Sequence, residues 1–201
     1  MNLRRLTQEA RTWRAPLVLA GVLVLMQWLA GPVWEHVRYD RQAILAGELW
    51  RLVTAHLIHL DFTHLGWNLA GLALVAWLFG REFRAREWAL ILACSTVAVD
   101  LGFLWLEPQL EWYVGFSGVL HGLMAAGLCA WLWRSPDSLT ALVATVFAAK
   151  LVWEHFAGPL PFTAGSLDAP VVHQSHTYGA VGGTVAALLL LWRQRGAWRP
   201  L

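Results

Sequence analysis

Three polar groupings in an otherwise apolar chain carry residue types that acyl transfer needs. The first is Ser117, flanked by glycines in Gly115-Phe116-Ser117-Gly118. A serine hydroxyl is a weak nucleophile unless a neighbouring base takes its proton during attack. We expect Ser117 to open a helix, where unpaired backbone N–H groups can stabilise a developing oxyanion. Close helix packing by small residues is the alternative interpretation of this motif.

The second grouping could supply the base. His176, Gly179 and Gly183 are spaced by three and four residues, so they share one face of a helix. The two glycines would let another helix approach closely where His176 points. A neutral imidazole within hydrogen-bond reach is the common general base for a serine. An interfacial histidine without a catalytic role is the alternative.

The third grouping is the pair His64 and Asn68, which has the spacing of one helical turn, as does a further pair, Lys150 and Glu154. His64 and Asn68 would share a face, and both can donate hydrogen bonds without full charge, as an oxyanion site requires. They could equally hold two helices together. Lys150 and Glu154 can neutralise each other in a poor solvent. We interpret them as a structural ion pair or as a pair that tunes substrate docking or gating.

The composition indicates which elements must position these residues. The chain has 201 residues, of which 58% are hydrophobic and 14% charged, which is too apolar for an ordinary soluble domain. A spanning helix needs about 20 mostly apolar residues. We therefore predict an all-α membrane protein with one helical domain over residues 1–201. Apolar runs place its six spans near 16–34, 64–80, 87–106, 116–133, 139–157 and 175–192.

Arginines predict the orientation of these spans. With a cytoplasmic N-terminus, three arginines fall outside, namely Arg38, Arg41 and Arg51. Eleven fall inside: Arg4, Arg5, Arg11, Arg14, Arg81, Arg84, Arg86, Arg134, Arg193, Arg195 and Arg199. This excess indicates an even number of spans with both termini cytoplasmic.

The same topology collects every histidine on one side. All eight fall outside or in the outer half of a span: His36, His56, His59, His64, His121, His155, His173 and His176. Ionisable groups at membrane depth are costly and tend to mark a functional site. The net charge of +2 carries no signal of nucleic-acid binding.

Taken in order, His-x-x-x-Asn, Gly-x-Ser-Gly and His-x-x-Gly-x-x-x-Gly on six spans resemble the rhomboid family of intramembrane serine proteases. Glu48-Leu49-Trp50-Arg51 is similar to the Trp-Arg element of that family's long first loop, and the likeness extends from about residue 45 to 190. The resemblance implies a six-helix rhomboid-like bundle. It also implies peptide hydrolysis of a transmembrane protein in or at the edge of the lipid bilayer, with no cofactor and no metal.

The resemblance also assigns roles to the polar residues. It implies that Ser117 is the nucleophile and His176 the general base, in a dyad with no Asp partner. His64, Asn68 and the Ser117 backbone N–H would then form the oxyanion hole. The supporting glycines would be Gly115, Gly118, Gly179 and Gly183.

His121 departs from the common rhomboid pattern, which has Tyr four residues after the nucleophile. With the short tails and the Lys150/Glu154 pair, it makes the chain resemble the rhombosortase branch. Those bacterial proteases process surface or secreted proteins that carry a C-terminal Gly-Gly sorting signal. The branch implies a cytoplasmic (inner) membrane protein with its site toward the periplasm. Because an i+4 side chain points along its helix, we expect His121 to support His176 rather than to act as the base.

Two other classes of function stay open. Eight histidines on one side could serve a metal or cation transporter, and His56-x-x-His59 and His173-x-x-His176 have suitable spacing. However, the sequence has no His-Glu-x-x-His helix and no Cys/His ligand set. The second alternative is an inactive rhomboid-like protein that binds membrane proteins without cutting them. Such relatives usually lack the Ser or the His, and both are present here.

Overall fold

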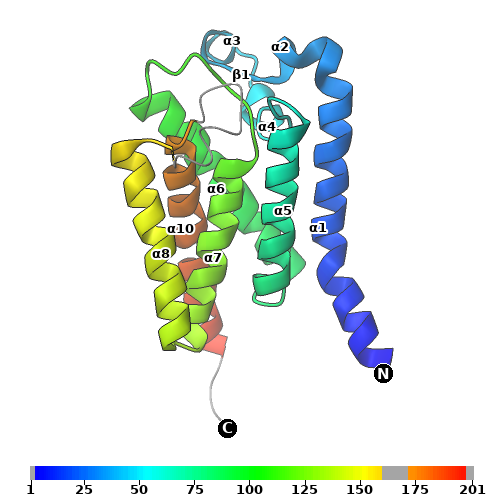
Figure 1. The fold of residues 1–201 in the computed structure, drawn as a ribbon, viewed down its shortest axis with the longest axis vertical. Helices are drawn as coiled ribbons and strands as arrows, with labels where there is room; N and C mark the ends of the chain where they lie inside the picture. The colour runs from blue at the N-terminus through cyan, green and yellow to red at the C-terminus, as the bar shows by residue number, and fades with distance from the viewer. Residues whose placement is uncertain (1–2, 160–171, 198–201) are drawn as a thin grey trace. The chain divides into compact units, whose positions relative to one another are not determined.

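The computed structural model describes residues 3–159 and 172–197, and most of them are helical (Figure 1). The chain divides into two compact units. Met1–Ala85 and Leu110–Phe116 form the first unit, and Arg86–Gln109 and Ser117–Leu201 form the second. The expectation of an all-α protein is confirmed apart from one pair of two-residue strands. The single domain over residues 1–201 stays a prediction.

The first unit combines two long helices with several short elements, all but the last of which belong to the loop between these helices. The elements are α1 (Leu3–Ala30), η1 (Gly31–Val33), α2 (Trp34–Val37), β1 (Tyr39–Asp40), α3 (Arg41–Leu45), α4 (Arg51–Thr54), α5 (Phe62–Phe79) and β2 (Trp112–Tyr113). Helices α1 and α5 are in contact. The strands β1 and β2 pair antiparallel, with Tyr39 opposite Tyr113.

Arg51 holds the loop between α1 and α5 together. This residue is only 5% exposed. Its guanidinium donates to the carbonyl oxygens of Glu35 and Arg38, at 2.7 and 2.9 Å, and to the Glu48 carboxylate at 2.7 Å. The neighbouring Trp50 indole donates to the His36 carbonyl at 3.1 Å. A buried guanidinium with satisfied donors fixes this loop against the start of α4.

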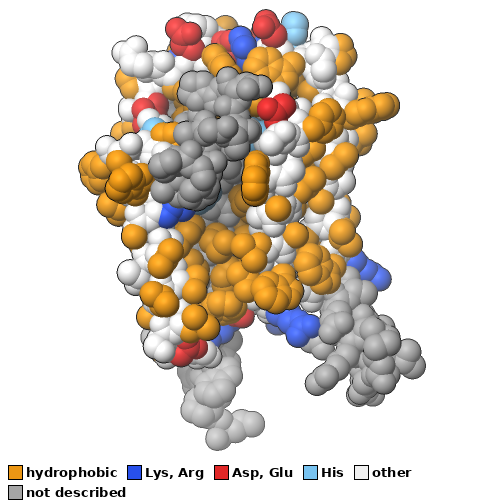
Figure 2. All heavy atoms as spheres, in the orientation of Figure 1, with side chains coloured by type: hydrophobic (Ala, Val, Ile, Leu, Met, Phe, Trp, Pro, Cys, Tyr) orange, Lys and Arg blue, Asp and Glu red, His pale blue; other side chains and the backbone are white. Residues whose placement is uncertain are grey.

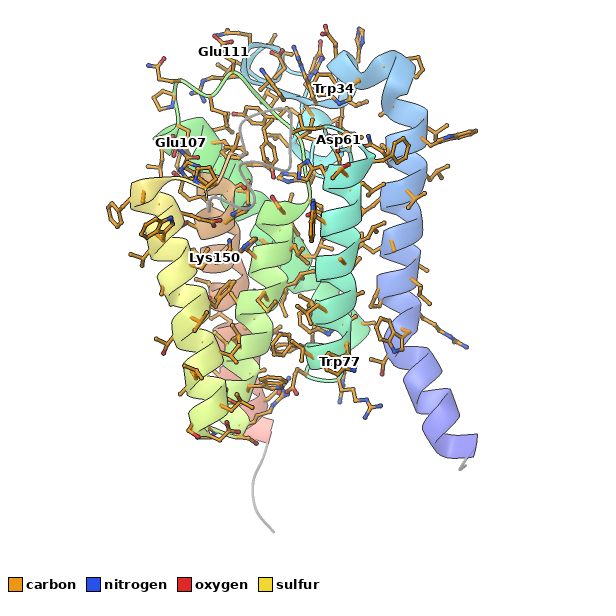
Figure 3. The ribbon with its side chains drawn as sticks, in the orientation of Figure 1. Trp34, Asp61, Trp77, Glu107, Glu111 and Lys150 are labelled. Atoms are coloured by element: carbon orange, nitrogen blue, oxygen red, sulfur yellow. The ribbon has the colours of Figure 1, made fainter. Side chains whose placement is uncertain are left out.

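Helix α5 begins where Asp61 caps it. The Asp61 side chain, labelled in Figure 3, accepts a hydrogen bond of 2.7 Å from the His64 backbone N–H. An N-cap of this kind satisfies a donor that the helix itself leaves unpaired. The cap therefore sets His64 in the first turn of α5, with Asn68 one turn further along the same face.

The second unit consists of longer helices that bundle closely. They are α6 (Ala85–Leu106), α7 (Ser117–Arg134), α8 (Ser138–Ala157) and α10 (Gln174–Ala197). The most extensive contact is between α7 and α10. A Cβ on Gly182 of α10 would lie 2.5 Å from the Cys94 carbonyl oxygen of α6, so these two backbones are also close. Small residues permit such close approach of neighbouring helices.

Each predicted span coincides with a helix of the structure, with boundaries that differ by a few residues. The exception is α1, which begins at Leu3 rather than near residue 16. Four helical segments of the described residues are long and apolar enough to cross a membrane: Thr12–Val37, Phe62–Phe79, Ala85–Leu106 and Ser138–Ala157. Helices α7 and α10 are less apolar because they carry the glycines and polar residues of the predicted site. The six-span topology with both termini cytoplasmic stays a prediction.

Large apolar side chains on these helices face outward. Trp28, Trp77 and Trp105 are 75%, 72% and 76% exposed. Figure 2 shows hydrophobic side chains over much of the visible helical surface. A soluble protein rarely exposes so much contiguous apolar surface, whereas lipid is a suitable solvent for it.

Candidate active site

Ser117 is the first residue of α7, and Gly115 shapes the turn that precedes it. Gly115 has φ of 131°, a conformation that residues with a side chain rarely adopt. A Cβ at this position would also lie 2.8 Å from Cε1 of His64. The Gly115 backbone N–H donates to the Ala55 carbonyl at 2.9 Å. Glycine is therefore required two residues before Ser117 for both backbone and packing reasons.

The structure brings Ser117 and His176 together from two helices. Nε2 of His176 lies 3.0 Å from the Ser117 hydroxyl oxygen. His176 stands in the first turn of α10 and is 6% exposed, whereas Ser117 is partly exposed. This is the contact that proton transfer from a serine to an imidazole requires.

Glycines on both helices make this contact possible. A Cβ on Gly179 of α10 would collide with the carbonyl oxygen of Gly118 on α7, and Gly183 stands in the same relation to Gly122. The two helix backbones therefore touch along successive turns. The sequence prediction that Gly179 and Gly183 admit a close helix next to His176 agrees with this packing.

A carboxylate lies on the other side of the His176 ring. Nδ1 of His176 is 2.8 Å from Oε2 of Glu154, which is 1% exposed. The Lys150 ammonium group donates to the same oxygen at 2.5 Å. Sequence reasoning expected the Lys150/Glu154 pair but missed the contact of Glu154 with His176. A carboxylate at membrane depth near a histidine-rich helix end was the signal available.

His121 lies beside His176 rather than between it and the serine. The two imidazole rings stack with centroids 3.9 Å apart and planes at 15°. Nδ1 of His121 is 2.7 Å from the Ser117 carbonyl oxygen, while its Nε2 is 2.7 Å from Nζ of Lys150. His121 therefore contacts the backbone of Ser117, and it is His176 that contacts the hydroxyl.

A single assignment of protons to the two imidazole rings is consistent with all of these hydrogen bonds. Glu154 accepts from Nδ1–H of His176, which leaves Nε2 with a lone pair toward Ser117. Lys150 donates to Nε2 of His121, whose Nδ1–H then donates to the Ser117 carbonyl. With both imidazoles neutral, the charges of Lys150 and Glu154 cancel. The five groups form one connected polar network inside the second unit (Lys150 is labelled in Figure 3).

The same network bears on metal binding. Ligand atoms of His121, Glu154 and His176 lie within 4.8 Å of one another, a grouping that could hold a metal ion. However, the Lys150 ammonium contacts Glu154 and His121 at this place. A protonated lysine is a competing cation and no ligand. The donor set therefore suits a lysine-neutralised network better than a metal centre.

His64 and Asn68, predicted as oxyanion donors, belong to the first unit. His64 is 8% and Asn68 3% exposed. The Asn68 side-chain amide donates to the His64 carbonyl at 3.0 Å. Among the described residues, Oδ1 of Asn68 has no hydrogen-bond partner. Their assignment to an oxyanion hole stays a prediction.

His59 is a further buried histidine of the first unit, in the loop before α5. It is fully buried, and its ring meets that of His64 edge-on with centroids 5.0 Å apart. Neither ring nitrogen has a hydrogen-bond partner among the described residues. Burial, and secondarily the proximity of His64, lowers the pKa of His59 to about 3. His59 is therefore neutral at physiological pH.

Comparison with known proteins identifies the class. The rhomboid domain family matches residues 46–193 of this chain. A protein of Bacillus subtilis (strain 168) named "Putative rhomboid protease YdcA" is 27% identical over 151 residues, which cover 74% of this chain and 70% of that protein. The chain belongs to the rhomboid family.

Membership of this family establishes the general class of activity and the location in a membrane. Rhomboid proteins are serine proteases that act on membrane proteins within the bilayer, and this chain is an integral membrane protein of that class.

Proposed function

We propose that this protein is a serine endopeptidase in which Ser117 and His176 perform the chemistry. The observation that carries the proposal is the 3.0 Å contact between the Ser117 hydroxyl and Nε2 of the buried His176. Glycine packing between α7 and α10 supports it, because such packing holds the two groups on rigid helices.

The reaction proceeds through an acyl-enzyme. The Ser117 oxygen bonds to the carbonyl carbon of the substrate while its proton moves to Nε2 of His176, and the carbonyl oxygen takes the negative charge. Collapse of this intermediate breaks the C–N bond, and the imidazolium gives its proton to the leaving amine. Water then attacks the ester with His176 again as base, which releases the new C-terminus and restores Ser117.

The negative charge on the carbonyl oxygen needs hydrogen-bond donors. We assign this role to His64, Asn68 and the backbone N–H of Ser117. The position of Ser117 at the start of α7 supports the last assignment, since the first N–H groups of a helix have no partner within it. His64 and Asn68 share one face of α5 and can both donate.

For the substrate, we propose a membrane-anchored protein with a C-terminal Gly-Gly sorting signal, as in the rhombosortase branch. His121 at the fourth position after Ser117 and the Lys150/Glu154 pair support this branch. We further propose six spans in the bacterial inner membrane, both termini in the cytoplasm, and cleavage at the periplasmic side. The excess of eleven arginines over three in the corresponding segments supports this orientation.

Two measurements test these proposals. A serine-directed fluorophosphonate should label the wild type in detergent micelles and should not label Ser117→Ala or His176→Ala. Labelling of Ser117→Ala at the wild-type rate would contradict the assignment, and an unlabelled, folded wild type would indicate an inactive binding protein. Co-expression with a Gly-Gly-tailed protein, followed by mass spectrometry of its new C-terminus, tests the substrate, and an uncut tail would contradict the branch.

A further inference from the structure

The proposed dyad uses one ring nitrogen of His176 and leaves the other unexplained. That nitrogen, Nδ1, lies 2.8 Å from the Glu154 carboxylate, which comes from α8 and is 1% exposed. A carboxylate removed from solvent is costly unless it is paired and hydrogen-bonded. An ion pair with Lys150 alone would not require Glu154 to reach a second helix.

We propose that Glu154 is a positioning residue for His176, so that Ser117, His176 and Glu154 act as a triad. This inference rests on the proposed Ser117/His176 chemistry. Glu154 accepts from Nδ1–H and thereby holds His176 in the tautomer whose Nε2 faces Ser117. It also stabilises the imidazolium that forms when His176 takes the serine proton, as the third group of a serine-protease triad does.

Lys150 balances the charge of this carboxylate. Its ammonium is 2.5 Å from the same oxygen that contacts His176, and 2.7 Å from Nε2 of His121. Before the reaction the network is therefore neutral, which lowers the cost of burying Glu154. During the reaction Lys150 opposes the new positive charge on His176. Glu154 therefore stabilises protonated His176, whereas Lys150 destabilises it.

Other ionisable groups near His176 set the background for a pH test. In the described part of the second unit, these are His121 on α7 and His173 just before α10. Helix α6 carries Asp100, Glu107 directly follows its last residue, and the Tyr178 hydroxyl of α10 donates to Glu107 at 2.7 Å. These groups stay unchanged when Glu154 or Lys150 is replaced, so the direction of each effect is attributable to the replaced charge.

The test measures, as a function of pH, the rate at which a fluorophosphonate phosphonylates the Ser117 hydroxyl with release of fluoride. Glu154→Gln keeps the size and an accepting oxygen but removes the charge, and phosphonylation should slow by roughly 10²- to 10⁴-fold. The acid limb of its pH profile should move to lower pH, because protonated His176 loses its counter-charge. Lys150→Met should move the acid limb to higher pH. Shifts in the same direction, or no shift in either variant, would overturn the proposal.

A double variant separates positioning from folding. Removing one partner of a buried ion pair strands the other charge, whereas removing both is often neutral for stability. Lys150→Met/Glu154→Leu should therefore fold, as judged by size-exclusion profile and unfolding midpoint, but react with the fluorophosphonate as slowly as Glu154→Gln. A wild-type phosphonylation rate in this folded double variant would show a merely structural ion pair.

Controls keep this test independent of the proposed function. His155→Gln replaces an exposed neighbour on α8 and should be phosphonylated at the wild-type rate. A change there as large as in Glu154→Gln would overturn the specific role of Glu154. If Ser117→Ala and His176→Ala abolish phosphonylation while the Glu154 variants do not, only the triad fails. If Ser117→Ala still reacts, the proposed function fails.

Discussion

Gly179 of α10 lies directly against the backbone carbonyl of Gly118 on α7. Gly118 directly follows the candidate nucleophile, and Gly179 lies one helical turn after the candidate base. No side chain fits between the two backbones at this point. The separation of Ser117 and His176 is therefore set by two residues that have no side chain.

Replacing Gly179 with Ala should pull the two groups apart. The added methyl group collides with the Gly118 carbonyl, so α7 and α10 must separate, at a cost of about 1–3 kcal/mol typical of overpacking. Phosphonylation of Ser117 by a fluorophosphonate should slow by at least about tenfold, since misplacement of about 1 Å can cost 10²-fold. Gly21→Ala, with open space around its Cβ, is the matched control. Equal phosphonylation rates in the two variants would contradict this account.

Replacing His121 should slow the phosphonylation of Ser117 by a fluorophosphonate without abolishing it. His121 stacks on His176 and hydrogen-bonds the Ser117 carbonyl, so His121→Ala removes support from both groups. We expect a loss of about 10-fold, against the 10²- to 10⁴-fold loss typical of removing a general base, as in His176→Ala. His121→Tyr restores a stacked ring and should recover part of the rate. Abolished phosphonylation in His121→Ala but not in His176→Ala would reverse the two roles.

Arg51→Lys should destabilise the loop between α1 and α5. The buried guanidinium donates to two carbonyl oxygens and one carboxylate, and a lysine ammonium cannot reproduce this fork. We expect a loss of about 1–3 kcal/mol, the cost of leaving buried polar partners unpaired. The unfolding midpoint in detergent measures it, and Arg86→Lys, at an exposed position, provides the control. Indistinguishable midpoints for the two variants would show that the Arg51 contacts contribute little.

His59 predicts a pH dependence of stability. Its pKa is about 3 in the folded protein, below the ordinary value of 6.5, so the unfolded chain binds the proton more readily. The contribution of neutral His59 to the free energy of unfolding is therefore fully present above about pH 6.5. It is lost as pH falls toward 3, by up to about 1.4 kcal/mol per pH unit.

The test compares unfolding midpoints between pH 7 and pH 5 in detergent. His59→Leu should flatten the pH dependence, because it removes the titrating group. His155→Gln should leave the dependence as in the wild type, because it removes an exposed histidine instead. An unchanged slope in His59→Leu would assign the acid sensitivity to other groups.

Much of the fold could be predicted because it depends on local properties of the chain. Apolar runs of about 20 residues form helices wherever lipid or other helices cover them, so each predicted span has its helix. Helix α1 extends further, to Leu3, with Pro16 inside it, and the helical segment before Pro16 contains no glycine or proline.

The candidate site was partly predictable for the same reason. The spacing of His176, Gly179 and Gly183 on one helical face follows from helix geometry alone. The spacing of Lys150 and Glu154 likewise predicted their ion pair, which has a distance of 2.5 Å. Sequence could not predict that Glu154 turns to His176, because this contact joins residues 22 positions apart on different helices.

The sequence by itself determined the residue types, their order and the helix face that each occupies, because these follow from the chemistry and the period of the helix. Only the tertiary structure decided which faces meet. The rotation and closeness of α7, α8 and α10 depend on interhelical packing, in which glycines let the backbones touch. That packing places the Ser117 hydroxyl on one nitrogen of His176 and the Glu154 carboxylate on the other.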